Sequence, residues 1–238
     1  IGTGKVARCH AEALKALPES EFTAVYGRDI AKARAFAASL GDGIQAYDSI
    51  PRMIREAGVR AVVVCTPHPA HAAPAVEAAR AGAHVLVEKP LAVSLADCDA
   101  MIRAAREAGV LLGGVSQRRF YRPVRRIRDA IDAGRIGRPV LGTVEMLGWR
   151  DEAYYRSDPW RGSWKGEGGG VLVNQAPHQI DLLQWFMGPV ESVQAYGATL
   201  GHERIEVEDT AVAALRFRNG ALGIVEGSTA AYPGFPKR

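Results

Sequence analysis

Apolar residues follow two alternating patterns in the first half of the chain. Short apolar runs predict strands at 22–26, 60–65, 83–87 and 110–115. Apolar positions at helical spacing predict helices at 5–17, 30–39, 70–81 and 94–108. The run at 60–65 is continuously apolar, which is typical of a parallel strand covered on both faces. Strands that alternate with helices of this length predict βαβ units and an α/β fold with a doubly wound parallel sheet.

The pattern changes after Gln117. Helices are predicted at 123–133 and 174–187, with an irregular segment rich in glycine and aromatic residues at 149–170. Strands are predicted at 139–147, 190–198, 207–217 and 221–229. Apolar positions alternate with a period near two in the later runs, and Asn219-Gly220 is typical of a hairpin turn. We therefore expect a first domain at 1–118 and an α+β domain at 119–238, with an open, mostly antiparallel sheet.

Composition narrows the class of protein without naming a function. The chain has 238 residues, 47% of them hydrophobic, and a net charge of +4. This weak positive charge suits an anionic small ligand better than nucleic acid, and no apolar run is long enough to span a membrane. The scattered cysteines Cys9, Cys65 and Cys98 are typical of reduced thiols in a cytoplasmic protein. Because a glycine turn stands at the very start and a loop-like stretch at the end, we expect a piece of a longer protein.

The segment Gly2-Thr3-Gly4-Lys5-Val6-Ala7 matches the G-x-G-x-x-A pattern at the start of a helix. Glycines permit a tight turn and let the backbone approach a pyrophosphate, which then lies on the helix N-terminus. An ordinary loop would give the same pattern, but the βα units that follow favour a dinucleotide.

The end of the second strand bears on which dinucleotide binds. The acid that binds the ribose hydroxyls of NAD is expected there, and the chain has Gly27-Arg28-Asp29. A small residue followed by Arg28 accommodates a 2′-phosphate, which favours NADP over NAD. Asp29 is either the ribose acid or the cap of the next helix.

Two further strand ends carry polar residues. Thr66-Pro67 and His71 follow the strand at 60–65, and Glu88-Lys89-Pro90 follows the strand at 83–87. Ligands bind at this end of an open parallel sheet, and a lysine there is costly to bury without a purpose. A metal at the histidines is disfavoured, because no carboxylate or thiolate is spaced to complete a site.

The helix at 174–187 carries Asn174, His178, Asp181 and Trp185 on one face. Asn174 is alternatively a helix cap, and His178 a core histidine. The preceding Gly168-Gly169-Gly170 favours a ligand, because glycines allow close approach of the backbone.

A cluster of arginines at 118–128 suggests nucleic acid at first sight. Val124, Ile127 and Ile131 form the apolar stripe of that helix, so most of the arginines lie on its solvated face. We therefore expect no nucleic-acid partner.

Together these motifs resemble the glucose–fructose oxidoreductase / inositol dehydrogenase (Gfo/Idh/MocA) family. The motifs are the glycine turn with His10, Thr66-Pro67 with His71, Glu88-Lys89-Pro90, Gln117-x-Arg119-Phe120, Trp160-Arg161-Gly162, and the glycine triplet with His178. The resemblance implies a Rossmann domain followed by a domain whose open sheet pairs subunits, as a homodimer or homotetramer. It implies NADP or NAD as cofactor, held by Gly2, Thr3, Gly4, Lys5, Val6, Arg28, Thr66, Pro67, His71, Glu88, Lys89 and Gln117.

The resemblance also implies a catalytic pair, Lys89 and His178, beside an alcohol carbon of a sugar, sugar derivative or cyclitol. Substrate contacts would come from Lys89, His178, Arg161, Trp164 and Asn174. Many members carry aspartate where this chain has Asn174, and an amide cannot take a proton. The alternatives are an NAD-dependent glycosidase of the same family and a non-catalytic dinucleotide-binding regulator.

Overall fold

The computed structural model describes residues 1–236, which form two compact units that divide between Val115 and Ser116. The division predicted between residues 118 and 119 falls a few residues later, inside the short 3-10 helix η2 (Gln117–Phe120). Within the described residues, none of the helices is both long and apolar enough to cross a membrane.

The first unit is built on parallel strands. They are β1 (Ala24–Tyr26), β2 (Gln45–Tyr47), β3 (Ala61–Val64), β4 (His84–Val87) and β5 (Leu112–Gly114). β1 pairs with β2, and β4 lies between β3 and β5. The first two residues connect these groups: the Gly2 N–H donates to the Tyr26 carbonyl at 2.9 Å, and the Cys65 N–H donates to the Ile1 carbonyl at 2.9 Å. Hydrogen bonds therefore run across the unit from β2 to β5.

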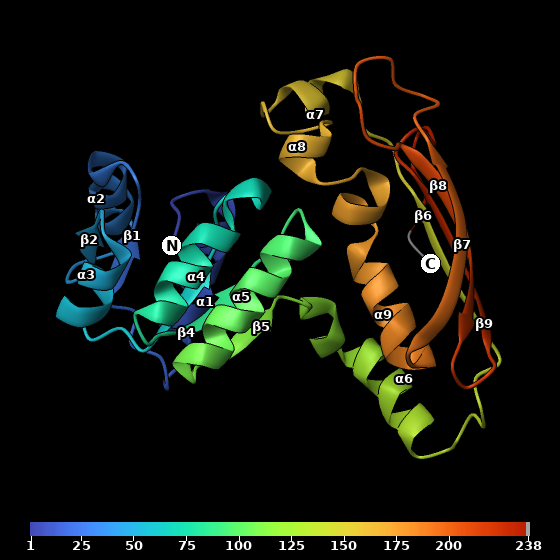
Figure 1. The fold of residues 1–238 in the computed structure, drawn as a ribbon, viewed down its shortest axis with the longest axis horizontal. Helices are drawn as coiled ribbons and strands as arrows, with labels where there is room; N and C mark the ends of the chain where they lie inside the picture. Colours follow the sequence, from blue (N-terminus) through green and yellow to red (C-terminus); the bar gives the residue numbers. More distant parts are fainter. Residues whose placement is uncertain (237–238) are drawn as a thin grey trace. The chain divides into compact units, whose positions relative to one another are not determined.

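Helices link these strands (Figure 1). They are α1 (Lys5–Ala16), α2 (Ile30–Ala38), α3 (Ile50–Glu56), the 3-10 turn η1 (His68–Ala70), α4 (Ala72–Arg80) and α5 (Leu95–Ala108). Side-chain caps begin several of them; Ser94, for example, accepts the Asp97 N–H at the start of α5. Alternate valines of β3 and β4 pack on Met101 and Ala104 of α5, so the core lies between sheet and helices.

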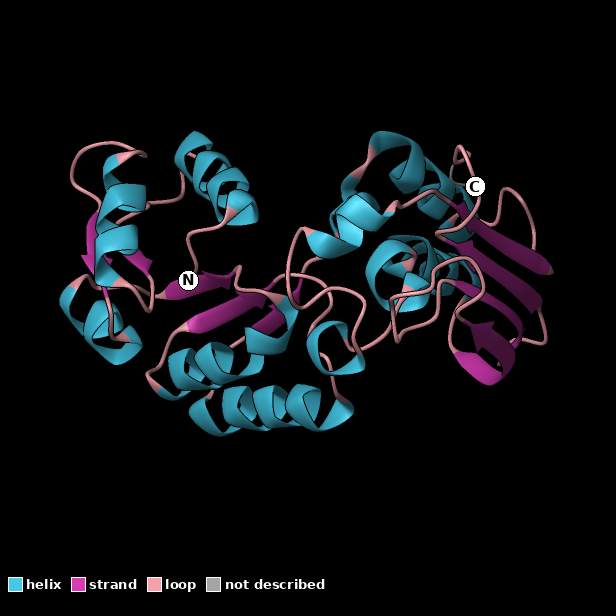
Figure 2. Cartoon of the chain, turned by 90° about the horizontal axis from the view of Figure 1, so that it is seen from above, coloured by secondary structure: helices cyan, strands magenta, loops and turns pink. Residues whose placement is uncertain are grey.

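The second unit is a sheet with helices on one face (Figures 1 and 2). The strands β6 (Leu141–Leu147), β7 (Val190–Ala198), β8 (Thr210–Phe217) and β9 (Leu222–Ser228) lie in the order β6-β9-β8-β7. β9 runs parallel to β6 and antiparallel to β8, and β8 runs antiparallel to β7. The sheet is therefore mixed and mostly antiparallel, as predicted, and Gly220 forms the expected hairpin between β8 and β9.

The helices of this unit are α6 (Arg122–Asp132), α7 (Glu152–Arg156), α8 (Trp164–Glu167), the π-helical turn η3 (Val171–Gln175) and α9 (Pro177–Met187). Leu183 and Met187 of α9 pack on Val144, Phe217 and Val225 of the sheet. A Cβ added at Gly142 would stand 2.6 Å from Leu183 Cδ1, so this strand glycine lets α9 lie close to β6.

The predicted fold class is confirmed, and several local expectations are wrong. β2 and α3 lie outside the predicted elements, and the segment 149–170 contains α7 and α8. Leu17, the last residue of the predicted helix 5–17, follows the end of α1 and is 51% exposed. β8 begins at Thr210 because Asp209 turns inward and accepts the N–H groups of Leu200, Gly201 and His202.

Candidate active site

The glycine turn has the backbone that the dinucleotide motif requires. Gly2 has φ +104°, and a Cβ there would stand 3.0 Å from the Cys65 carbonyl oxygen. Gly4 is the N-cap of α1, and the first helical hydrogen bond runs from the Arg8 N–H to the Gly4 carbonyl. Gly4, Lys5 and Val6 are exposed, and the first turn of α1 contains no acidic residue. Backbone N–H groups at an exposed helix N-terminus suit an anion, so the residues present fit a pyrophosphate.

Arg28 and Asp29 follow β1. Asp29 accepts the Ala31 N–H at 3.0 Å and the Lys32 N–H at 3.1 Å, so its carboxylate caps α2. Of the two roles open to Asp29 from sequence, the structure shows the cap. Arg28 is exposed beside it.

His71 joins the loops that follow β3 and β4. The ring is 1% exposed, with Nε2 2.8 Å from the Thr66 carbonyl oxygen and Nδ1 2.9 Å from the Pro90 carbonyl oxygen. Thr66 Oγ1 also donates to the Ala70 carbonyl at 2.7 Å, and Pro67 lies between them at the N-cap of η1. His71 therefore stabilises the backbone next to Lys89. A direct cofactor contact from His71 stays a prediction.

Glu88 fixes the same loop from the other side. Its Oε1 lies 2.8 Å from His10 Nε2 of α1, and its Oε2 accepts the Lys89 N–H at 3.0 Å. Burial alone would raise the pKa of Glu88, but the hydrogen bonds from His10 and Lys89 outweigh it and hold the pKa below its ordinary value. Lys89 is half-buried, and the Lys89–Pro90 peptide bond is cis.

Cys65 lies between the glycine turn and Thr66. Burial raises the pKa of its thiol to about 11, which keeps the sulfur protonated near neutral pH. We assign it no chemistry.

In the second unit, a polar network joins α7, α8 and η3. Three side-chain nitrogens lie within hydrogen-bond distance of the Tyr154 hydroxyl oxygen. They are Arg161 Nη1 at 2.5 Å, Gln175 Nε2 at 2.9 Å and Asn174 Nδ2 at 3.2 Å. Asn174 Nδ2 also donates to Glu167 Oε1. Asn174 lies in η3, and the N-cap of α9 is Ala176, so Asn174 is not the cap of that helix.

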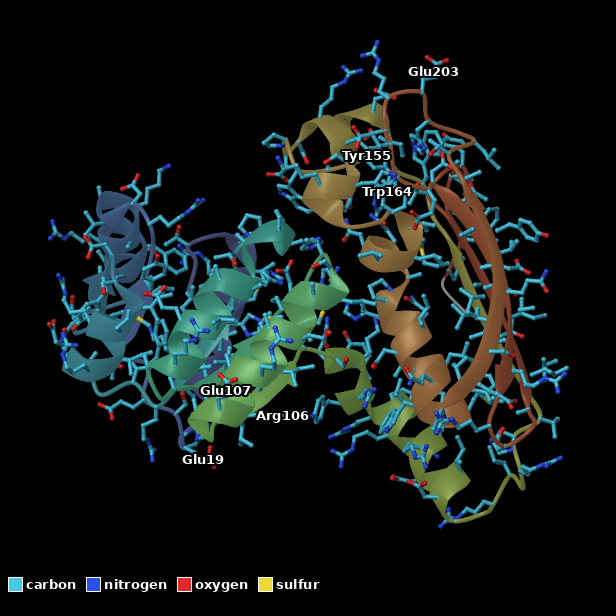
Figure 3. The ribbon with its side chains drawn as sticks, in the orientation of Figure 1. Glu19, Arg106, Glu107, Tyr155, Trp164 and Glu203 are labelled. Atoms are coloured by element: carbon cyan, nitrogen blue, oxygen red, sulfur yellow. The ribbon has the colours of Figure 1, made fainter. Side chains whose placement is uncertain are left out.

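The second unit also carries four other residues that the sequence predicts for the site: His178, Trp164, Arg161 and Gln117. His178 is half-buried in the first turn of α9. Trp164, at the start of α8, is 56% exposed, whereas Arg161 also donates to Asp158 and stacks on Tyr154. Figure 3 labels Trp164 on α8 and Tyr155 on α7. Gln117 is exposed at the start of η2.

Asp181 has a partner that the spacing along the helix did not indicate. Arg119 donates to both of its carboxylate oxygens, at 2.8 Å and 2.6 Å. This bidentate pair connects η2 with α9.

The glycine triplet has a structural role, and the predicted approach of a ligand to it stays a prediction. Gly168 has φ +79° and ends α8, and Gly169 has φ +152°. A Cβ at Gly170 would stand 1.8 Å from the Glu208 carbonyl oxygen. The close neighbour of Gly170 is therefore the backbone of Glu208.

Sequence reasoning missed Tyr154, Glu167 and Glu208. Glu167 is 1% exposed, and Glu208 accepts the N–H groups of Gly170 and Leu172. Their only sequence signal is a carboxylate or phenol beside glycines, which is common in exposed loops.

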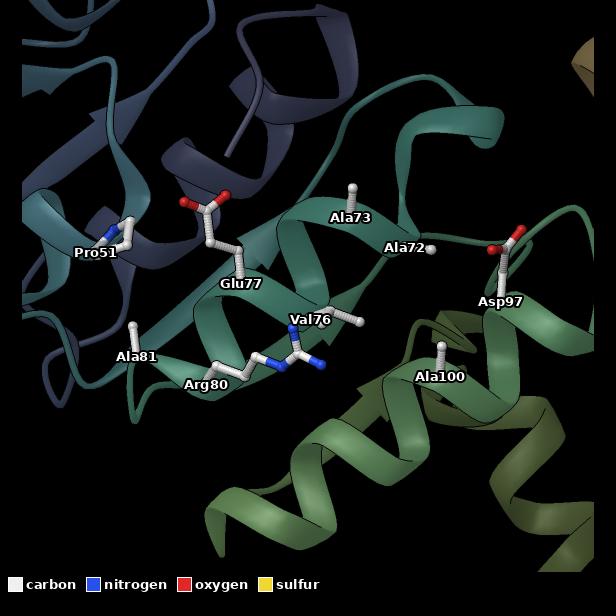
Figure 4. A pocket seen from close by; sticks show the side chains of 9 residues that line it. All are labelled: Pro51, Ala72, Ala73, Val76, Glu77, Arg80, Ala81, Asp97 and Ala100. Carbon is white, nitrogen blue, oxygen red and sulfur yellow. The ribbon is translucent and has the colours of Figure 1, made fainter.

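Across residues 1–236, three or more His, Cys, Asp or Glu side chains nowhere gather as a metal ion would need. A hollow of about 630 Å³ lies among α3, α4 and α5 and contains none of the predicted site residues (Figure 4). Its lining consists of Pro51, Ala72, Ala73, Val76, Glu77, Arg80, Ala81, Asp97 and Ala100.

Comparison with models of known protein families shows which family this chain belongs to. The model described as "Oxidoreductase family, NAD-binding Rossmann fold" matches residues 1–114, and the model described as "GFO/IDH/MocA C-terminal domain" matches residues 124–238. The chain belongs to the Gfo/Idh/MocA family. The expected family, its oxidoreductase class and its NAD-binding Rossmann domain are thereby confirmed.

Known relatives agree with this assignment. Myo-inositol 2-dehydrogenase of Thermotoga maritima is 34% identical over 242 residues, which cover 100% of this chain and 70% of the relative. 1,5-Anhydro-D-fructose reductase of Ensifer adhaerens is 36% identical over 79% of this chain and 56% of its own length. The WlbA dehydrogenase of Bordetella pertussis, solved with NADH and UDP-GlcNAcA, is 38% identical with a TM-score of 0.89, over 98% of this chain and 72% of that one.

Proposed function

We propose that this chain transfers a hydride between a nicotinamide dinucleotide and a secondary alcohol carbon of a sugar, sugar derivative or cyclitol. The observation that carries the proposal is the loop after β4, where Glu88, held by His10, bonds the Lys89 N–H. A lysine so placed at the ligand-binding end of a parallel sheet is suited to catalysis. The dinucleotide, when bound, supplies the hydride acceptor or donor. The relatives named for inositol and anhydrofructose support the substrate class.

Lys89 and His178 handle the proton in this proposal. An imidazole ordinarily titrates near neutral pH, so His178 Nε2 or Nδ1 is suited to take the hydroxyl proton during oxidation. The Lys89 ammonium stabilises negative charge that develops on the alcohol oxygen. Asn174 orients a hydroxyl but takes no proton, and Trp164 offers an exposed apolar ring for a sugar face. Arg161 acts at the same site, partly through Tyr154.

Substitution of Lys89 tests the proposal directly. We expect Lys89→Met to lower kcat about 1,000-fold or more, and His178→Asn about 100-fold or more, with the dinucleotide dissociation constant changed less than about threefold. Turnover is measured with a panel of sugars and cyclitols, and dinucleotide binding by thermal shift. Lys32→Met, which removes a lysine whose side chain is 78% exposed, is the matched control. Near-normal turnover by Lys89→Met would overturn the assignment.

The same panel separates the alternatives. A chain that cleaves a glycoside with no net change in reduced-nicotinamide absorbance is a glycosidase. One that binds dinucleotide but turns over no compound in the panel is a regulator.

The finer parts of the proposal concern cofactor and assembly. We propose NADP over NAD, on the basis of Arg28 at the end of β1 and the use of Asp29 as a cap. We propose a homodimer or homotetramer through the outer face of the second-unit sheet. Location in the cytoplasm stays a prediction.

A further inference from the structure

Glu167 is a buried carboxylate that the proposed mechanism does not use. It ends α8, and its Oε2 accepts the Gly162 N–H at 2.6 Å while its Oε1 accepts Asn174 Nδ2. Burial raises the pKa of Glu167, and the bonds from Gly162 and Asn174 together with the charge of Arg161 oppose that rise. A carboxylate that receives two N–H groups acts as an acceptor at both oxygens.

The Tyr154 hydroxyl determines how the neighbouring amides are turned. A neutral hydroxyl has two lone pairs and one hydrogen, yet the nitrogens of Arg161, Asn174 and Gln175 all face it. Of the two amides, Asn174 cannot turn, because turning it would set its oxygen against the Glu167 carboxylate. Asn174 therefore keeps both N–H groups toward Glu167 and Tyr154.

We propose that Glu167 is a positioning residue that fixes the Asn174 amide so that position 174 accepts hydrogen bonds from the substrate. With both amide hydrogens committed, any further hydrogen bond of this side chain is accepted by Oδ1. The ligand group that fits is a hydroxyl that donates, and an ether or carbonyl oxygen is rejected. The role of residue 174 toward substrate rests on the proposed function, but the pairing of Glu167 with Asn174 does not.

A stability cycle tests the pair without any substrate. Asn174→Asp sets two carboxylates together and should lower Tm by about 5–10 °C. Glu167→Gln sets two amide nitrogens together, so one amide must turn, and Tm should fall by about 2–5 °C. In the double variant the amide and the carboxylate exchange places, and we expect it to regain most of the loss.

Glu208→Gln is the matched control, because Glu208 accepts backbone N–H groups of Gly170 and Leu172 through its own carboxylate oxygens. Combined with Asn174→Asp, it should add its own loss and rescue nothing. Strictly additive losses in the Glu167/Asn174 cycle would overturn the proposal.

A second readout follows the amide itself. In the ¹⁵N spectrum of the full chain, one side-chain N–H of Asn174 should lie downfield and lose that shift in Glu167→Gln. Amide signals at ordinary positions in the native chain would contradict the proposed orientation.

The functional readout is the KM for the alcohol that the chain turns over in the panel. Glu167→Gln should raise its KM about 10-fold or more, and the double variant should return KM to within about threefold, because the carboxylate introduced at position 174 again accepts. A KM unchanged in Glu167→Gln would refute the substrate role. If no alcohol is turned over, the proposed function fails while the stability cycle and the spectrum still decide the pairing.

Discussion

Arg28 and Asp29 are neighbours in sequence with different structural roles. Asp29 is bonded to two N–H groups of α2, whereas Arg28 lies at the end of β1. An arginine beside a carboxylate that already caps a helix favours the 2′-phosphate of NADP over the free ribose hydroxyl of NAD.

We therefore expect Arg28→Ala to weaken NADP binding about 10–100-fold, because a charge-assisted hydrogen bond to phosphate is lost. NAD binding should change less than about threefold. Calorimetric titration of both dinucleotides measures the difference, with Lys32→Ala as the control for loss of a nearby surface charge. An equal loss for NAD and NADP would argue against the proposed preference.

At the residue scale, sequence predicts the strand ends but not the polar networks. Lys89 follows an apolar run and precedes proline, so the pattern of residues alone indicates its place at the end of β4. The roles of His10 and Glu167 depend on contacts with residues 78 and 7 positions away, respectively. Periodicity carries no information on which polar groups will meet after folding.

At the scale of elements, the link from α8 to η3 depends on close backbone contact. Gly170 lies against the Glu208 backbone, and the Glu208 carboxylate bonds the Gly170 and Leu172 N–H groups. The segment that carries Asn174 is therefore held by the residue just before Asp209. This contact is intolerant of any side chain at position 170.

Gly170→Ala tests that contact. We expect a loss of stability of about 3 kcal/mol or more, because the added Cβ would overlap backbone that cannot rotate away. Gly197→Ala in β7 is the matched control, since its Cβ would stand 3.6 Å from Glu208 Cβ, an ordinary contact. Urea denaturation measures both variants. Equal stability of the two would show that the turn adapts.

Longer elements are easier to predict than short ones, for a physical reason. α5 spans 14 residues and has several turns in which apolar spacing is visible, whereas β2 has three residues, of which Tyr47 alone is buried. The apolar spacing places the start of α9 too early, because η3 continues that spacing with a π-helical turn. Spacing alone does not distinguish such a turn from an α-helix.

At the scale of the whole molecule, the outer face of the second sheet exposes several large apolar side chains. Tyr196 lies opposite Val212 in the β7–β8 register, and the two are 74% and 49% exposed. Ile224 and Leu222 extend this face onto β9 with 41% and 52% exposed. Large apolar side chains that are exposed together on one face are typical of an interface, which supports pairing with a second copy.

Val212→Lys should then convert the chain to monomers, because a buried lysine at the centre of the interface would have no partner. Size-exclusion chromatography with light scattering measures the assembly. Leu95→Lys on α5, which replaces an 84% exposed leucine of the first unit, is the control and should leave the assembly intact. A native chain that is monomeric throughout the micromolar range would refute the pairing.

His10 gives α1 a second role. The helix that offers open N–H groups at its first turn also bonds Glu88, and Glu88 bonds the backbone of Lys89. Anything that orders α1 therefore orders the loop after β4, and anything that orders that loop steadies α1. Dinucleotide binding at the N-terminus of α1 and ordering of the loop that carries Lys89 are therefore linked by one coupling free energy. By reciprocity, each favours the other by the same amount. The free energy of ordering the Lys89 loop thus contributes, through α1, to the affinity for the dinucleotide.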